Sequence, residues 1–215
     1  MKLRLLIAFI VVGMVSVSAG AQIKKLSGAQ FNKAMDAAFA ASDVKVRREV
    51  TKSDAYESGK VTQSATITHE FMPPDRERQV FDELFLGERR IEEWITVDQN
   101  RYEKNAQGEW LRAESIKTTP RATTVTSRDE EKLTIYTSQA SKLAGKRVTI
   151  LKRVYKSSPD EMQISETFVI YISKAGLVLK NEQTTVQVGK ANYRKESTTF
   201  TYDPKNLKIE VPSLK

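Results

Sequence analysis

The chain has 215 residues, 35 Lys and Arg against 27 Asp and Glu, one histidine (His69) and no cysteine. The lack of cysteine excludes a thiol nucleophile, a cysteine-based metal site, an iron–sulfur cluster and disulfide bonds. Basic and acidic residues are interspersed, so the net charge of +8 favours a solvated surface over nucleic-acid binding. A mild attraction to anionic lipid or cell-wall polymer stays open.

Residues 1–21 have the pattern of a secretory signal peptide. Lys2 and Arg4 give a positive start, Leu5–Val15 is an apolar run too short to span a membrane, and an A-x-A-like cleavage site ends at Ala21. The alternative is a buried N-terminal helix. We expect export to the periplasm or the medium, with a net charge of +6 after loss of two basic and no acidic residues. No cysteine follows the cut, so no lipid anchor is expected after cleavage.

The remaining residues, 22–215, are long enough for a single domain with its own core. A helix is predicted over Gln30–Ala41, where apolar residues recur at helical spacing. Ser27 is its expected N-cap, and Gln30 completes the glutamine form of a capping box. One apolar stripe on a short helix needs a partner surface, which the rest of the chain is expected to supply as sheet.

Short runs rich in Val, Ile, Thr, Tyr and Phe follow, separated by turn residues, and predict strands. The predicted strands are Val44–Lys52, Lys60–Phe71, Arg76–Leu86, Arg89–Asp98, Arg101–Lys104, Glu109–Ala113, Lys146–Lys156, Gln163–Ser173, Leu177–Val188 and Ala191–Tyr202, with Leu207–Val211 as a terminal edge strand. Their short connections require antiparallel neighbours, and therefore a meander.

Residues 128–144 give conflicting signals. Ser127 and Glu130 form an S-x-x-E capping box, and apolar residues then recur at helical spacing as far as Ala144, which favours a helix. The β-branched run Thr134–Thr137 favours a strand instead. We expect the helix, preceded by a loop over 116–126.

These elements predict a mainly β, α+β fold. A curved antiparallel meander would form an incomplete β-barrel, and the N-terminal helix and the second helix would cover its concave face. Alternation on the strands supports one dry and one wet face: Phe168, Ile170 and Ile172 alternate with Thr167 and Tyr171. Between helices and sheet lies either a packed core or an apolar pocket, and both alternatives stay open here.

Catalytic signatures are lacking in the sequence. His69 lies within an alternating strand, without a G-x-S-x-G elbow or a second histidine, so a structural role is favoured over a triad or a zinc site. Glu92 and Glu93 are adjacent on a strand and point to opposite faces, so they cannot form an acid–base pair. The acidic group at 129–131 suits a helix N-terminus. We expect no enzyme activity, no cofactor and no metal.

Large aromatic side chains are distributed over several of the predicted strands. Ordinary core packing is the simpler interpretation. The sharper one is the lining of an apolar ligand cavity. The candidate lining residues are Phe81, Phe85, Trp94, Trp110, Phe168 and Tyr171.

Two stretches resemble motifs of a known family. Pro74-Asp75-Arg76 with "RRIEEWITVDQNRYEKNAQGEW" (89–110) resembles a P-D-R … I-x-V/I … Y-x-K … G-x-W run, and "FVIYISKAGLVLKNE" (168–182) resembles an x-I-x-x-x-G-L-x-x-K-x-E hairpin. The closing stretch "FTYDPKNLKIEVP" (200–212) is similar to the family's last strand. The family is the outer-membrane lipoprotein carrier-like (LolA/LppX-like) superfamily of exported bacterial proteins.

This resemblance implies a half-barrel whose apolar cavity holds acyl chains, as in carriers that sort lipoproteins to the outer membrane. The leading hypothesis is thus an exported envelope protein that binds an acyl chain, a lipoprotein or another apolar ligand. The alternative is a non-enzymatic structural or regulatory module that binds another envelope protein. Neither hypothesis involves nucleic acid.

Overall fold

The computed structural model describes residues 22–113, 133–157, 164–187 and 191–214. Within these ranges it contains one helix, α1 (Gly28–Asp43), and twelve strands. The strands are β1 (Lys24–Leu26), β2 (Arg47–Glu57), β3 (Lys60–Met72), β4 (Arg76–Phe85), β5 (Glu88–Val97), β6 (Asn100–Lys104), β7 (Trp110–Arg112), β8 (Thr134–Leu143), β9 (Lys146–Lys156), β10 (Ile164–Ser173), β11 (Val178–Gln187) and β12 (Tyr193–Tyr202).

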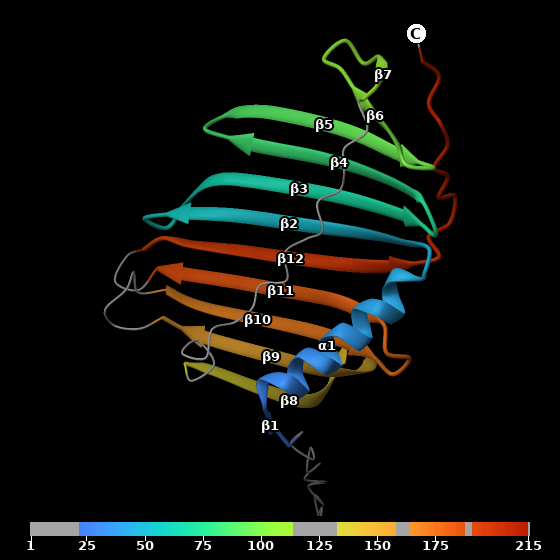
Figure 1. Ribbon diagram of the computed structural model, residues 1–215. Helices are drawn as coiled ribbons and strands as arrows, with labels where there is room; N and C mark the ends of the chain where they lie inside the picture. Colours follow the sequence, from blue (N-terminus) through green and yellow to red (C-terminus); the bar gives the residue numbers. More distant parts are fainter. Residues whose placement is uncertain (1–21, 114–132, 158–163, 188–190, 215) are drawn as a thin grey trace, which may run out of the picture.

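All twelve strands join one antiparallel sheet in the order β1-β8-β9-β10-β11-β12-β2-β3-β4-β5-β6-β7 (Figure 1). Successive strands pair within two blocks, β2 to β7 and β8 to β12, and the pairing of β12 with β2 joins the blocks. The mainly β class and the antiparallel pairing are therefore confirmed. The sheet is open, with β1 and β7 at its two ends, and its expected curling into an incomplete barrel is not confirmed.

Tight turns explain why neighbouring strands are antiparallel. Leu86 and Gly87 join β4 to β5 with φ values of 49° and 90°, and Ala144 and Gly145 join β8 to β9 with φ values of 48° and 79°. Two-residue loops with positive φ at both positions match the twist of the strands that they connect. The glycine accepts this conformation without steric cost.

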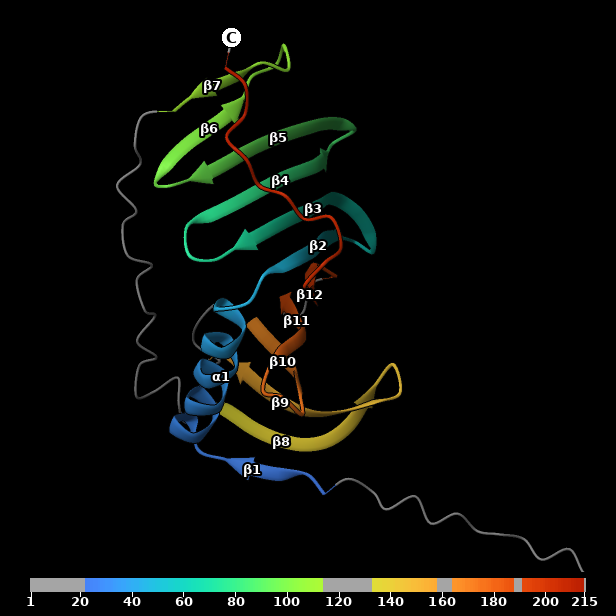
Figure 2. The same cartoon turned by 90° about the vertical axis from the view of Figure 1, so that its right-hand side faces the viewer.

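The strand register divides the sheet's side chains between two faces, because successive side chains alternate along a strand. We call the face that packs against α1 the helix face, and the other the opposite face. Phe168, Ile170 and Ile172 of β10 lie on the helix face and contribute to the cluster with α1, as the alternation predicted. Figure 2 shows that α1 lies against the strands of the β8–β12 block and leaves β3 to β7 uncovered by it.

Helix α1 begins as the sequence predicts. Ser27 Oγ accepts a hydrogen bond from the Gln30 amide, and the Gln30 side chain accepts one from the Ser27 amide, which forms the capping box. Phe31 and Ala38 are buried on the sheet side, and the ring of Phe31 lies 5.1 Å from that of Tyr136 on β8. This packing stabilises a helix that would be marginal alone.

The C-terminal end of α1 is fixed to the sheet through Ser42, which is 1% exposed. Its hydroxyl donates to the Ala38 carbonyl at 2.8 Å and accepts from the Val178 amide of β11 at 3.1 Å. The hydroxyl of Tyr202 lies 2.8 Å from Ser42 Oγ and 2.6 Å from the Val178 carbonyl oxygen. Ser42 therefore satisfies a buried strand amide with a helix side chain.

Arg47, the first residue of β2, holds the same helix end from the other side. Its guanidinium donates to the carbonyl oxygens of Ser42 and Asp43, both at 3.2 Å, and pairs with the Asp43 carboxylate at 2.9 Å. It also pairs with Glu49 at 2.5 Å and lies 4.5 Å from the ring centre of Phe71. A cation at a helix C-terminus is favourable because the last carbonyl groups carry partial negative charge.

The opposite face carries a smaller cluster under the C-terminal segment. Ile95, Val97 and Ile209 are buried together there, with Leu207 and Trp110 packed against them. Residues 207–211 were predicted to be an edge strand, which is wrong: they have no strand assignment and cross the opposite face instead. The Arg76 side chain donates to the Ile209 carbonyl at 3.3 Å. Burial of Ile209 against Ile95 and Val97 therefore holds the segment without strand pairing.

The second helix predicted within 128–144 is wrong where the structure describes it. Thr134–Leu143 is strand β8, paired along its length with β9. Tyr136 contacts α1 on one face, whereas Ile135 lies on the other, which is strand alternation. The helical spacing is outweighed by pairing with the long strand β9 and by the β-branched and aromatic run Thr134–Thr137. Intrinsic propensity and hydrophobic periodicity are weaker determinants of secondary structure than tertiary contacts. One helix therefore covers the sheet among the described residues.

Three expectations fall outside the described residues. They are the signal peptide at 1–21, the loop at 116–126 and the capping box of Ser127 and Glu130.

Replacing Ser42 with alanine tests how α1 is held. The Ser42→Ala variant loses the hydroxyl that pairs with the buried Val178 amide, and a buried group left unpaired costs about 1–3 kcal/mol. Urea unfolding should show a loss of that size, whereas Ser197→Ala, at a half-buried serine of β12, should change stability less. Equal stability of Ser42→Ala and the wild type would contradict this account.

Candidate ligand-binding face

The structure divides the six predicted lining residues between the two faces. Phe81 and Phe85 of β4 and Trp94 of β5 lie on the helix face, beyond the strands covered by α1. Phe168 lies on the same face but packs against the α1 cluster. Trp110 and Tyr171 lie on the opposite face. The structure therefore brings three of the six together on neighbouring strands.

The three aromatic residues lie on the same face of β4 and β5 as Ile67 of β3. Phe81 is paired with Ile67 of β3, so the two side chains are direct cross-strand neighbours on the helix face. Trp94 lies diagonally from Phe81, since Phe81 pairs with Glu92 two residues before it. Phe85 lies four residues further along β4 on the same face, beyond Glu83, and is 50% exposed. We call Ile67, Phe81, Phe85 and Trp94 the aromatic strip.

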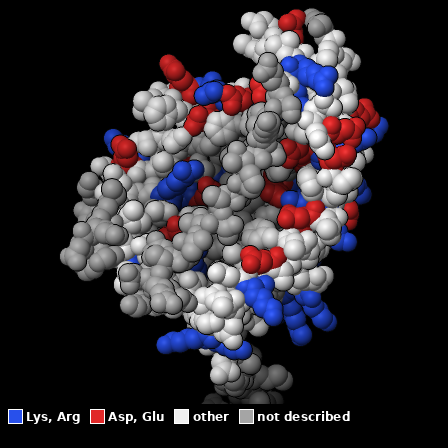
Figure 3. All heavy atoms as spheres, in the orientation of Figure 1, with Lys and Arg blue, Asp and Glu red and all other residues white. Residues whose placement is uncertain are grey.

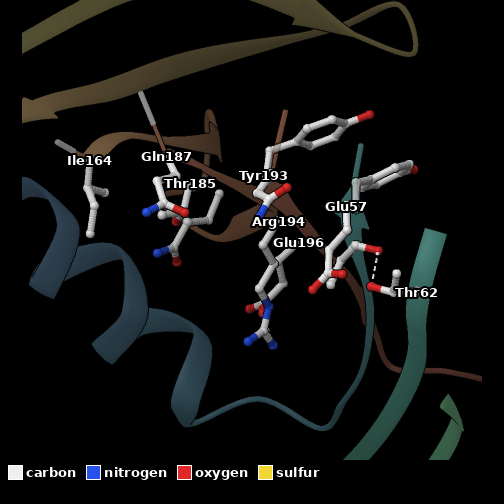
Figure 4. Close-up of a pocket in the computed structure, with 12 residues that line it drawn as sticks. Glu57, Thr62, Ile164, Thr185, Gln187, Tyr193, Arg194 and Glu196 are labelled. Carbon is white, nitrogen blue, oxygen red and sulfur yellow. Dashed lines mark hydrogen bonds and ion pairs between the residues drawn. The ribbon is translucent and has the colours of Figure 1, made fainter. Parts of the chain in front are cut away.

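A hollow of about 540 Å³ lies on the helix face beside this strip. Figure 4 shows Ile164, Thr185 and Gln187 on one side of it and Glu57 and Thr62 on the other, with β12 side chains between them. None of these residues is among the lining residues predicted from the sequence. Their only sequence signal is strand alternation, which does not distinguish a pocket wall from a solvated face.

The hollow and the strip share one row of paired residues. Thr185 of β11 pairs with Arg194 of β12, which pairs with Ala55 of β2. Ala55 pairs with Gln63 of β3, and Gln63 pairs with Phe85. An elongated ligand could therefore extend from the hollow to the aromatic strip without leaving the helix face.

Polar side chains that line the hollow make hydrogen bonds and an ion pair with neighbouring side chains. The Arg194 guanidinium donates to Ser53 Oγ at 3.0 Å and lies 3.5 Å from the Glu196 carboxylate. The Gln183 amide donates to Glu166 at 3.1 Å. Polar groups at one end and aromatic rings at the other suit a ligand with a polar end and an apolar body.

The other aromatic candidates have partners of their own. Phe168 lies 5.5 Å from the Arg153 guanidinium, and the Trp110 ring lies 5.5 Å from Lys104 Nζ. The Tyr171 hydroxyl donates to Glu182 at 2.7 Å. Burial and the nearby Glu182 carboxylate raise the pKa of Tyr171 to about 12. These three residues lie away from the aromatic strip and have packing or hydrogen-bonding roles where they stand.

His69 also lies on the helix face. Its Nε2 atom is 3.3 Å from a carboxylate oxygen of Glu77, and this hydrogen bond is the main cause of the lowered pKa of Glu77. Among the described residues, no three or more His, Cys, Asp or Glu side chains are placed to hold a metal ion. In the same part of the chain, no helix is long and apolar enough to cross a bilayer.

No protein-family model matches the chain, and no curated protein matches it. Several solved structures align with most of the chain. LprF from Mycobacterium bovis aligns with 88% of this chain and all of its own, at 9% identity and a TM-score of 0.46. An outer membrane lipoprotein-sorting protein domain from Vibrio parahaemolyticus aligns with 82% of this chain and 93% of its own, at 8% identity and a TM-score of 0.28.

A LolA superfamily protein from Nitrosomonas europaea aligns with 79% of this chain and 90% of its own, at 8% identity and a TM-score of 0.30.

Replacing Glu182 with glutamine tests the environment of Tyr171. The uncharged amide no longer opposes ionisation of the phenol, so the pKa of Tyr171 should fall from about 12 toward the ordinary 10. It should stay above 10 because burial, the larger cause, remains. NMR titration with labelled tyrosine measures this change. An unaltered Tyr171 pKa in Glu182→Gln would show that the negative charge of Glu182 does not contribute.

Proposed function

We propose that this protein is a non-enzymatic binding protein for an amphiphile with an acyl chain, and that the chain lies along the aromatic strip. The observation that carries the proposal is the half of the helix face on which α1, the one helix among the described residues, does not pack. Helix α1 packs on the β8–β12 block, and the row from the hollow leads to Phe85 on the other half. Burying a side chain such as Phe81 against a ligand is favourable by about 1.5–3 kcal/mol.

The proposal extends to the predicted lining as a set. Phe81, Phe85 and Trp94 would contact the chain directly. Phe168 would form the edge of the site next to α1. Trp110 and Tyr171 would pack on the opposite face of the sheet. We further propose that residues 22–215 form one domain, exported after cleavage of a signal peptide at 1–21.

A second candidate function follows from one exposed turn. Leu84, Phe85 and Leu86 at the end of the β4–β5 hairpin are 49%, 50% and 75% exposed. A contiguous exposed apolar patch is typical of a protein interaction site. The alternative is therefore a module that holds another envelope protein by this hairpin.

Two neighbouring substitutions separate the functions. Phe85 and Leu84 are adjacent and equally exposed, but they point to opposite faces of the sheet. Phe85→Asp should weaken binding of a fluorescent fatty acid about tenfold or more, as loss of one buried aromatic contact implies. Leu84→Asp should leave this affinity unchanged.

Native mass spectrometry of the protein purified from its host complements this titration, and an acyl-bearing ligand should be recovered with the wild type. If neither fatty-acid uptake nor a co-purified lipid is detected, the carrier proposal fails. Equal losses of fatty-acid affinity in the two variants would contradict a site on the helix face, because Leu84 lies on the opposite face.

A further inference from the structure

The net charge of the described sheet is concentrated at one edge. β1, β8 and β9 carry two, one and five basic residues respectively and no acidic residue. These strands are neighbours at one end of the sheet. We call this group the basic edge: Lys24, Lys25, Lys142, Lys146, Arg147, Lys152, Arg153 and Lys156.

The other half of the sheet is electrically balanced. Strands β2 to β7 carry eleven basic and eleven acidic residues. On their opposite face, ion pairs join Arg48 to Glu70, Glu70 to Arg78, Arg78 to Glu93 and Glu93 to Lys104. The basic edge is therefore a local feature and not a sample of the overall composition.

The cations of the basic edge are largely unpaired within the described residues. Arg153 pairs with Glu166 of β10, and it is the one member of the edge with an ion pair there. Lys25, Lys142 and Lys152 are exposed. In Figure 3 the lowest part of the molecule, where β1 and the β8–β9 hairpin lie, shows blue side chains without red ones. Unpaired cations so close together attract a polyanionic partner.

Exposed apolar side chains lie among these cations. Ile23 and Ile135 are 64% and 59% exposed. Together with Ile150 and Val154 they line a shallow hollow of about 290 Å³ on the opposite face, and Lys152 lies at the same hollow. The edge thus combines positive charge with apolar side chains on one surface.

We propose that the basic edge docks on the surface of an anionic lipid bilayer. Four of its cations, Lys25, Lys146, Lys152 and Lys156, lie on the opposite face, the same face as the shallow hollow. A plane fits cations spread over one face of three strands better than a linear polymer does. Strand β9 extends roughly 36 Å, since each of its 11 residues adds about 3.3 Å. Ile23 and Ile135 would enter the headgroup region while the lysines contact the lipid phosphates, the combination used by interfacial protein segments. The inference does not depend on the ligand of the aromatic strip.

Co-sedimentation of the purified protein with vesicles tests the proposal. Vesicles of phosphatidylcholine mixed with phosphatidylglycerol should bind the protein at low salt, and vesicles of phosphatidylcholine alone should not. Raising the salt concentration should release it, because the attraction between exposed charges is screened. Binding that is equal for both vesicles would contradict the proposal.

Matched charge reversals locate the surface. Lys25→Glu with Lys152→Glu should weaken vesicle binding by about 25-fold or more, since each lysine near an anionic membrane contributes about fivefold. Lys52→Glu with Lys60→Glu makes the same change in net charge on exposed residues of β2 and β3, and should have a much smaller effect. Equal losses in the two pairs would show that net charge alone drives the binding and would overturn the proposal.

Ile135→Ser distinguishes a bilayer from a soluble polyanion. It should weaken vesicle binding while leaving heparin binding unchanged, because only the bilayer accepts an apolar side chain. If Ile135→Ser has no effect and heparin competes fully, the partner is a polymer and the bilayer assignment is wrong. Fatty-acid uptake without vesicles should stay intact in every edge variant, so failure of docking and failure of ligand binding are distinguishable.

Discussion

The contact that fixes the C-terminal end of α1 determines what the rest of the sheet can do. Ser42 bridges the helix to the Val178 amide, and Arg47 holds the last helix carbonyl groups from the start of β2. Both residues are buried, so neither contact can be exchanged for water without cost. Together with the capping box at Ser27, they place α1 over the β8–β12 block. Helix α1 consequently does not pack on the helix face of β3 to β5.

The sheet therefore has two different ends with two different chemistries. Near β4 and β5, Phe85 lies in the row that continues from the hollow at Arg194, and the half-buried rings of Phe81 and Trp94 lie further along the same face. At the β1–β8–β9 edge, the charge is positive throughout and isoleucines are exposed. A carrier of amphiphiles needs a surface that covers an acyl chain and a surface that meets the membrane. The two proposals assign these tasks to separate strands, so that each can be altered without the other.

Much of the fold could be predicted from the sequence, because it depends on local signals. The capping box of Ser27 and Gln30 and the alternation around Ile170 each have short-range causes. The face on which a distant aromatic residue lies could not be predicted, since it depends on the pairing of many strands. Trp94 and Trp110 illustrate this: three strand pairings place them on opposite faces. Register shifts beside Thr62 of β3 and Leu179 of β11 also change the alternation of those strands without a clear sequence signal. The local spacing over 128–144 predicts a helix, because it contains no information on the pairing of β8 with β9.

The central claim is that the ligand lies on the helix face between the hollow and the aromatic strip. The most direct test is NMR of the labelled protein with a fatty acid that carries a nitroxide on its chain. Paramagnetic broadening should be strongest at Ile67, Phe81 and Trp94, and weak at Ile91 and Leu84 on the opposite face. Broadening that is equal on both faces, or confined to the opposite face, would contradict the account.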